Sequence, residues 1–333
     1  MIHGVPFWLR CDHAAARENI EGHLSAYAVA GGGKATAGGV SVEIEYREVQ
    51  YPVPLHARRV LLYDAVRCYV LDGRTYFTDY FSTLAIDPEG RTIRGNLSPD
   101  TLRDYGLNRF VHIQFTLALF EALRLHGLFY LHASALQGPD GTGYVLCGNA
   151  GSGKTTLTLC LIESGFKFLS DDTVFLRLSG DRDVEVLGFA RAFHLAADLI
   201  AEREFLGKFR ELPDFCPRRG RKLLSADRCF PERRLDGMVN PQVILFPCIR
   251  EDASRLESLS RAEALNILIP QSLAVMFNPE TAPPHLEALK RMASRGRAFC
   301  LFTGPEIKGS PAAVRTLVEQ ARDQAQTKEG DAP

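Results

Sequence analysis

The chain has 333 residues, with 39 Lys and Arg against 40 Asp and Glu, and its net charge is -1. Hydrophobic residues make up 46% of it and charged residues 24%, which is typical of a globular protein and excludes a disordered one. A charge so close to zero excludes global electrostatic attraction to nucleic acid or to an anionic membrane, so partners must be recognised locally.

The cysteine pattern and the apolar runs indicate a cellular compartment. None of the eight cysteines forms a Cys-x-x-Cys pair, and most lie in apolar runs, which favours free buried thiols over disulfides or a zinc site. The apolar residues 5–9 are too few for a signal peptide, and no run approaches the length of a membrane span. We expect a cytoplasmic protein with no membrane partner.

The N-terminal part of the chain shows the alternation of apolar and polar residues that is typical of β-strands. The pattern is clearest at residues 40–46 and 67–71. Asp72-Gly73 then predicts a turn, after which residues 75–78 return as the partner strand. We expect a small, antiparallel, β-rich α+β domain over residues 1–105, with one face exposed to solvent.

Strands and helices alternate in the second part. Apolar residues at helical spacing predict a helix over 107–126 that Gly127 ends. Strands are then expected at 129–137, 144–147 and 166–170, with a helix at 155–164. Further elements include a helix after the capping box Ser260-Arg261-Ala262-Glu263 and a last helix that begins at Ser310-Pro311. We expect an α/β domain over residues 106–325 and a flexible tail over 326–333.

Residues 148–155 match the phosphate-binding-loop pattern Gly-x-x-x-x-Gly-Lys-Thr in full, between an apolar strand and an amphipathic helix. Glycines permit positive φ and a close approach of backbone N–H groups to phosphate oxygens, and the helix start adds a positive dipole end. Lys154 supplies a charge for the β- and γ-phosphates, and Thr155 offers a hydroxyl to Mg²⁺. The predicted nucleotide-binding residues are Gly148, Asn149, Ala150, Gly151, Ser152, Gly153, Lys154, Thr155 and Thr156.

Asp171 and Asp172 follow the apolar strand 166–170. Ligands collect at the carboxyl ends of parallel strands, where the phosphate loop also lies, so both carboxylates are candidates for the metal and the nucleophile. Neighbouring strand residues point to opposite faces, so one should face the γ-phosphate while the other reaches the metal's water shell or a basic neighbour.

Three further features fit either a functional or a structural interpretation. His132 lies on the strand before the loop strand and either tunes an aspartate or is a structural residue. Glu185 is a charge in a strand-like run. The segment 203–234, which is richest in basic residues at 218–222, is either a clamp for an acidic ligand or a solvated loop. It lacks interleaved aromatic residues, so we expect no nucleic-acid partner.

The run from Leu131-His132-Ala133-Ser134 through the phosphate loop to Leu169-Ser170-Asp171-Asp172 resembles the kinase domain of HPr kinase/phosphorylase. It is more similar still to the HPr-kinase-related proteins found beside bacterial peptide-biosynthesis genes. The similarity covers residues 107–249. Many families share the phosphate loop, but its combination with His-x-Ser upstream and Asp-Asp downstream is more specific. The resemblance implies an α/β fold with a P-loop, HPr-kinase-like (carboxykinase-like) core.

The same resemblance implies roles for individual residues. Asp171 matches the carboxylate that accepts the hydroxyl proton, Asp172 its partner, and His132 the histidine set near that carboxylate. Together with Lys154 these are the predicted catalytic residues. Glu185 and Gly188 match the family's Glu-Ile-Arg-Gly signature, in which the glutamate lies near the metal. The predicted metal ligands are therefore Thr155, Asp172 and Glu185.

One position departs from that signature. Its arginine is Leu187 in this chain, and Arg191 is the expected replacement.

The resulting hypothesis is a kinase that uses ATP and Mg²⁺ to phosphorylate a Ser or Thr hydroxyl of a protein or peptide, and the resemblance also suggests a homo-oligomer. In-line transfer of the γ-phosphate leaves most of the catalysis to positioning and charge stabilisation. Two alternatives stay open. One is a small-molecule kinase or carboxykinase-like enzyme, and the other is a binding protein that nucleotide switches without catalysis.

Overall fold

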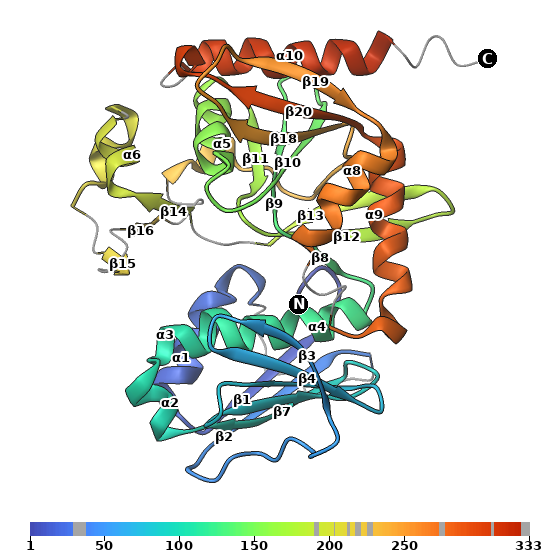
Figure 1. The fold of residues 1–333 in the computed structure, drawn as a ribbon. Coiled ribbons are helices and arrows are strands. Elements are labelled where there is room, and N and C mark those ends of the chain that lie inside the picture. The colour runs from blue at the N-terminus through green and yellow to red at the C-terminus, as the bar shows by residue number, and fades with distance from the viewer. Residues whose placement is uncertain are drawn as a thin grey trace. The chain divides into compact units, whose positions relative to one another are not determined.

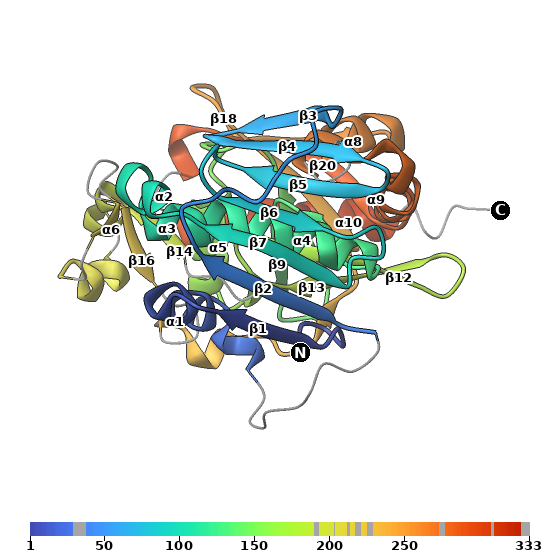
Figure 2. The same cartoon turned by 90° about the horizontal axis from the view of Figure 1, so that it is seen from below.

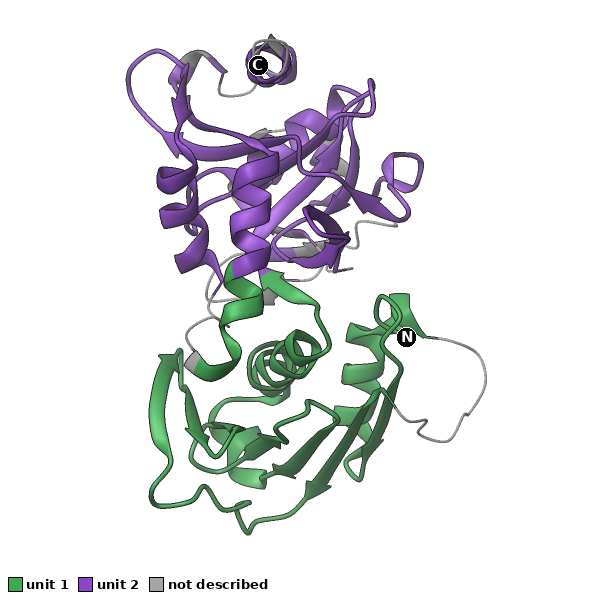
Figure 3. Cartoon of the chain, turned by 90° about the vertical axis from the view of Figure 1, so that its right-hand side faces the viewer, with its two compact units in different colours: residues 1–130, 273–286 green, residues 131–272, 287–333 purple. Residues whose placement is uncertain are grey.

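The computed structural model describes residues 1–28, 38–189, 193–202, 204–211, 214–216, 221–224, 229–272, 277–307 and 310–327. The chain is a mixed α/β protein that divides into two compact units (Figure 3). Unit 1 comprises Met1–Tyr130 and Leu273–Leu286, and unit 2 comprises Leu131–Ser272 and Glu287–Pro333. These units differ from the predicted domains 1–105 and 106–325, because unit 1 also includes the helices after residue 105 and a segment from late in the chain.

Unit 1 contains a mixed sheet of seven strands in the order β1-β2-β7-β6-β5-β4-β3 (Figure 2). Its elements are β1 (Phe7–Cys11), α1 (Ala14–His23), η1 (Ser25–Tyr27), β2 (Val40–Tyr46), β3 (Arg58–Tyr63), β4 (Val66–Leu71), β5 (Arg74–Thr78), β6 (Thr83–Ile86), β7 (Thr92–Leu97), α2 (Pro99–Asp104), α3 (Leu107–Arg109), the π-helix η2 (Phe110–Phe115) and α4 (Thr116–Leu125), with η8 (Pro279–Thr281) in its later segment.

The sequence predicts an antiparallel sheet in unit 1, but the sheet is mixed. The β3–β7 strands form the expected antiparallel meander, but β1 pairs with β2 and β2 with β7 in parallel. The alternation in β2 buries Val40, Val42 and Ile44 on one face. Helix α4 packs against β5, β6 and β7 and buries nearly its whole length (Figure 2).

Unit 2 contains the phosphate-loop motif. The chain enters it from β8 (Phe129–Leu131), and its elements are β9 (Ala133–Gln137), β10 (Gly143–Cys147), α5 (Lys154–Glu163), β11 (Lys167–Ser170), β12 (Val174–Ser179), β13 (Asp183–Gly188), β14 (Phe193–Ala196), α6 (Ala197–Glu202), η3 (Glu204–Phe209), β15 (Asp214–Cys216), β16 (Arg221–Leu224), η5 (Pro231–Arg233), β17 (Met238–Val239), β18 (Val243–Ile249), β19 (Arg255–Leu259), α8 (Arg261–Leu268), η6 (Ile269–Gln271), β20 (Arg297–Thr303), η9 (Pro305–Ile307) and α10 (Pro311–Thr327). Helix α9 (Pro283–Arg295) begins in unit 1 and continues in unit 2 from Glu287.

The main sheet of unit 2 has the order β11-β9-β10-β18-β20-β19 (Figure 1). Strands β10, β18 and β20 are parallel, and β9 runs antiparallel to both of its neighbours, so β11 runs in the same direction as β10. Helices α5 and α10 pack against each other. A core rich in Leu, Ile and Phe side chains lies under these helices and includes Leu146, Leu161 and Phe299.

The described strands also form sheets of four, β17-β13-β12-β8, and three, β14-β16-β15. The predicted strand over 129–137 is in fact two strands, because the ladder breaks at His132 between β8 and β9. The predicted helix over 107–126 is helical almost throughout, and Gly127 ends it with φ of 79°. None of the described helices is long and apolar enough to cross a bilayer.

Candidate active site

The phosphate-loop motif connects β10 to α5, as the strand–loop–helix pattern predicts. Gly151 and Gly153 have φ of 82° and 97°, the left-handed region that glycine adopts without strain. Gly148 is not left-handed, and Ser152 Oγ lies 3.1 Å from the place that a Cβ would take at this glycine. Gly153 is the N-cap of α5, and no side chain caps this helix start. The first backbone N–H groups of α5 are therefore available to an anion.

Two side chains of the loop are set for a phosphate ligand. Lys154 is 7% exposed, and its Nζ donates to Gly148 O at 2.6 Å and to Asn149 O at 3.2 Å. Burial lowers the pKa of its ammonium group, which Asp172 and Asp171 partly offset. The buried Ser152 Oγ has no hydrogen-bond partner among the described residues. An unpartnered hydroxyl and a buried ammonium group in the same loop fit an anionic ligand.

The order of the strands brings the acidic pair to the loop. Cys147, at the end of β10, lies opposite Ala133 at the start of β9, and Ser170, at the end of β11, lies opposite Ala135. The carboxyl ends of β10 and β11 therefore meet at one edge of the sheet, beside the beginning of β9.

At this edge Asp171 links the loop to the neighbouring strands. The Asp171 carboxylate is 4% exposed and accepts from Thr155 Oγ1 at 3.1 Å and from Ser134 Oγ at 2.5 Å. Burial raises the pKa of this carboxyl to about 6, and the nearby Asp172 carboxylate adds to the rise, while the bonds from Ser134 and Thr155 oppose it.

Asp172 has a different environment from its neighbour. Its side chain is 37% exposed, and its backbone has φ of 71°, an uncommon conformation for a residue other than glycine. His132 Nδ1 lies 2.9 Å from Asp172 O and 3.2 Å from Asp172 Oδ1. A carbonyl oxygen can only accept, so Nδ1 carries the proton and the imidazole holds Asp172 in place. The His132 ring therefore contacts Asp172, whereas the resemblance set this histidine near Asp171.

Glu185 lies apart from this cluster. It is opposite Arg177 in the β12–β13 ladder, and its Oε2 accepts from Arg177 Nε at 2.8 Å and Nη2 at 2.6 Å. Within the described part of the chain the carboxylate bonds to this arginine alone, not to Thr155 or Asp172. Gly188 has a packing role, since a Cβ there would stand 2.5 Å from Leu169 O.

The remaining predicted features lie mostly outside the described residues. Arg191, the expected replacement for the signature arginine, is in the range 190–192, which the structure does not describe. Of the basic stretch 218–222, residues 218–220 also lie outside the described residues, and Arg221 and Lys222 belong to β16.

Sequence reasoning missed two residues of the site. Ser134, which donates to Asp171, is part of the His-x-Ser pattern, so a signal for it was present. Gln271, whose Nε2 donates to Asn149 Oδ1 at 2.6 Å, comes from the distant η6 and had no local signal.

The residues present fit a nucleoside triphosphate with Mg²⁺. The loop offers Lys154, the free Ser152 hydroxyl and the amides at the start of α5, while Thr155 and Asp171 provide adjacent oxygens. No group of three or more His, Cys, Asp or Glu in the described ranges is arranged to hold a metal. That finding is compatible with Mg²⁺, which takes few protein ligands and completes its shell with water and phosphate oxygens.

Comparison with known proteins adds little. No family model matches the chain, and no curated protein matches it. Among solved structures it is similar to the Hpr(Ser) kinase/phosphatase from Coxiella burnetii, with a TM-score of 0.31 and 12% identity over 59% of this chain and 98% of that one. A similarity this weak carries no argument, so the functional proposal depends on the site.

Proposed function

We propose that this chain is a kinase that uses ATP and Mg²⁺ to phosphorylate a Ser or Thr hydroxyl of a protein or peptide. The contact between Thr155 and Asp171 carries the proposal, because it joins a complete phosphate-loop motif to a pair of carboxylates at the edge of one sheet. The P-loop core of the HPr-kinase type belongs to this proposal. So does the choice of a peptide acceptor, which depends on the sequence resemblance.

The contacts favour exchanging the roles that the resemblance implied for the two aspartates. Asp171 is buried, and its two oxygens are engaged by Thr155 and Ser134, so it is placed to share a metal with Thr155. Asp172 is more exposed and is held by His132, so an incoming hydroxyl has access to it. A general base must reach the proton that it accepts, which favours Asp172 for that task.

Lys154 and the loop amides would bind the phosphates in this scheme, and bound Mg²⁺ would neutralise charge on the transferred group. Lys154 must first release the carbonyl oxygens of Gly148 and Asn149, because its ammonium group donates to both. Since Arg177 engages Glu185, we leave that residue out of the proposed metal set.

The experiment is transfer of label from γ-labelled ATP and Mg²⁺ into Ser- and Thr-containing peptides and into an extract of the source organism. Wild type is compared with Asp172→Asn, and Asp12→Asn, at an exposed aspartate of unit 1, is the control. We expect label with wild type and the control but not with Asp172→Asn. Binding of ATP with no label in any acceptor would contradict the kinase and favour a nucleotide-switched binding protein.

A further inference from the structure

Gln271 lies at the end of η6, directly after a helix whose start is fixed. Helix α8 begins with a capping box in which Ser260 Oγ accepts from Glu263 N and the Glu263 carboxylate accepts from Ser260 N. Gln271 follows this helix and is 8% exposed. A buried glutamine must satisfy its amide inside the protein, so its partners indicate what it holds.

Gln271 bonds to two parts of the candidate site. Its side-chain Nε2 donates to Asn149 Oδ1 at 2.6 Å, and its backbone carbonyl accepts from His132 N at 2.9 Å. Asn149 belongs to the phosphate loop, and its own backbone carbonyl accepts from Lys154. His132 occupies the break between β8 and β9, so its N–H bonds to Gln271 outside any strand ladder.

These contacts form one continuous path. It runs from Asn149 in the loop through Gln271 to His132, and from the His132 imidazole to Asp172. The side-chain bond is short, at 2.6 Å, and the backbone bond has an ordinary length of 2.9 Å. Gln271 is buried, whereas its partner Asn149 is exposed.

We infer that Gln271 is a positioning residue that fixes the phosphate loop relative to the His132–Asp172 pair. The inference deepens the proposed function and rests on it. Gln271 is not placed to touch the reacting atoms. It acts by holding Asn149, whose backbone carbonyl Lys154 contacts, at a fixed position relative to His132. His132 in turn orients Asp172.

The test is a double-mutant cycle on Mg–ATP binding, measured by titration calorimetry, with kcat measured on the same proteins. Gln271→Met keeps the side-chain volume but removes the donor, and Asn149→Ala removes the acceptor from the exposed side of the same bond. The control is Gln242→Ala, which removes a glutamine bond to Gly143 N at the opposite end of β10. Thermal unfolding of all variants separates loss of fold from loss of positioning.

We expect Gln271→Met to weaken Mg–ATP binding by about three- to tenfold, the loss of one hydrogen bond, and to lower kcat as well. In the Asn149→Ala background the same change should have no further effect, because the bond is already absent. Gln242→Ala should change neither quantity, although it also removes one glutamine bond.

Two results would overturn the inference while leaving the proposed function intact. One is a Gln271→Met variant whose affinity for Mg–ATP is within twofold of wild type. The other is a double variant in which the losses of affinity caused by Gln271→Met and Asn149→Ala multiply, because the two residues would then act independently. Wild type that fails to bind Mg–ATP would overturn the proposed function itself, and the inference with it.

Discussion

Asp171 and Asp172 are neighbours in sequence with opposite environments. Asp171 is buried under the hydroxyls of Thr155 and Ser134, whereas Asp172 is partly exposed and bent into a left-handed conformation beside His132. Holding such a conformation costs about 1–2 kcal/mol, which the surrounding contacts must supply, and residues of this kind cluster at functional sites.

These environments predict different losses for the two asparagine variants. We expect Asp172→Asn to lower kcat by about 10²–10⁴-fold with Mg–ATP binding retained, because it removes the proposed base. Asp171→Asn should instead raise the Mg²⁺ concentration needed for half-maximal activity, since it removes a carboxylate beside Thr155. Steady-state kinetics over a Mg²⁺ titration would distinguish the two. The reverse assignment of losses would restore the roles implied by the resemblance.

The raised pKa of Asp171 predicts how stability depends on pH. A folded-state pKa of about 6, against an ordinary value of 3.8, means that the folded protein binds this proton more tightly than the unfolded chain. The contribution of this group is therefore most favourable in acid, and it is lost as pH rises from about 4 to about 6. Above that range the charged carboxylate costs on the order of 3 kcal/mol.

Asp171→Asn removes this titration. In metal-free buffer we expect the variant to gain stability relative to wild type as pH increases from about 4 to about 6, measured by urea unfolding. Asp172→Asn is the matched comparison, since that carboxylate is more exposed. A stability difference for Asp171→Asn that does not change with pH would contradict the cause given for the shift.

Among the residues of the site, the sequence indicated those that belong to a local sequence motif. The loop glycines, Lys154, Thr155 and the acidic pair follow motif spacing, and their strand–loop–helix context is present. The family resemblance implied that Glu185 is a metal ligand, but Glu185 bonds to Arg177, a partner that only the register of β12 and β13 determines. Gln271 is 122 residues from Asn149, so no local pattern indicated it.

At the scale of elements, Gly153 joins the loop to α5. Its φ of 97° is strained for any other residue, although a Cβ would meet only Ile249, at 3.6 Å. We expect Gly153→Ala to destabilise unit 2 by about 1–2 kcal/mol and to weaken Mg–ATP binding. Gly148→Ala is the comparison, because Gly148 is not left-handed and its Cβ would meet the small Ser152 hydroxyl. Equal losses of stability in chemical denaturation would contradict the importance of φ.

Helix α4 carries a buried ion pair, and we expect its disruption to destabilise the protein more than Gly153→Ala does. Arg124 Nε and Nη2 donate to the two oxygens of Glu121 at 2.8 and 2.6 Å, and both side chains are 1% exposed. Arg124→Met leaves an unpaired buried carboxylate, so we expect a loss of about 3–5 kcal/mol in urea unfolding. The double change with Glu121→Leu should recover most of it. If the free energy of unfolding of Arg124→Met were within about 1 kcal/mol of wild type, which is what a surface ion pair contributes, the prediction would be wrong.

Element boundaries followed the sequence where caps and turns are local. The capping box at Ser260 and the turn at Asp72-Gly73 lie where predicted. The break at His132 was not predictable, because it depends on the distant acceptor Gln271 O. The parallel pairing of β1 and β7 with β2 was missed for a similar reason, since alternation indicates a strand but not the direction of its neighbour.

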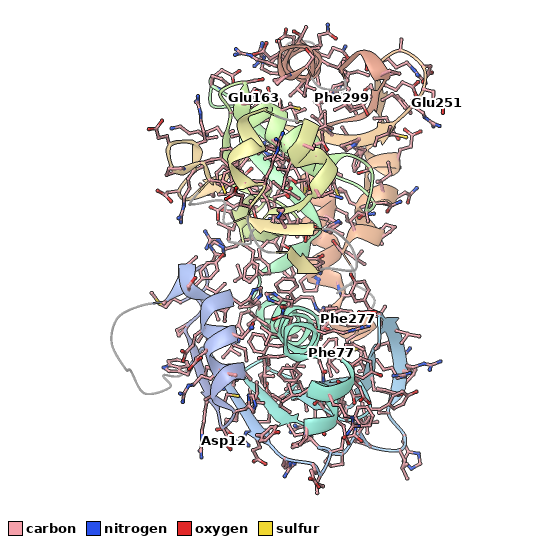
Figure 4. All side chains as sticks on the ribbon, turned by 90° about the vertical axis from the view of Figure 1, so that its left-hand side faces the viewer. Asp12, Phe77, Glu163, Glu251, Phe277 and Phe299 are labelled. Atoms are coloured by element: carbon pink, nitrogen blue, oxygen red, sulfur yellow. The ribbon has the colours of Figure 1, made fainter. Side chains whose placement is uncertain are left out.

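At the scale of the molecule, unit 1 is built from two separate parts of the chain. The segment Leu273–Leu286 joins it through a contact of Phe277 with Phe77, whose ring centroids are 5.3 Å apart (Figure 4). Thr281 accepts from Arg124, and His285 Nε2 donates to Tyr130 O at 3.0 Å. Domain boundaries predicted from composition assign residues that are close in sequence to one domain. They could not predict that the segment Leu273–Leu286 belongs to the N-terminal unit.

The segment predicts that a late residue stabilises the N-terminal unit. Phe277 is 1% exposed, and we expect Phe277→Ala to destabilise unit 1 by about 3–5 kcal/mol. The probe is hydrogen exchange of the full chain, read separately in β5 and in β10. Loss of protection in β10 with none in β5 would contradict the assignment of Phe277 to unit 1.

The central claim is that the loop binds a nucleoside triphosphate with Mg²⁺. Its most direct test is titration calorimetry of ATP into wild type and Lys154→Met, with and without Mg²⁺. We predict saturable one-to-one binding by wild type that strengthens with Mg²⁺ and weakens by at least about tenfold in Lys154→Met, because a buried ammonium group is lost from the phosphates. No heat of binding with wild type, or equal affinity in the variant, would contradict the claim.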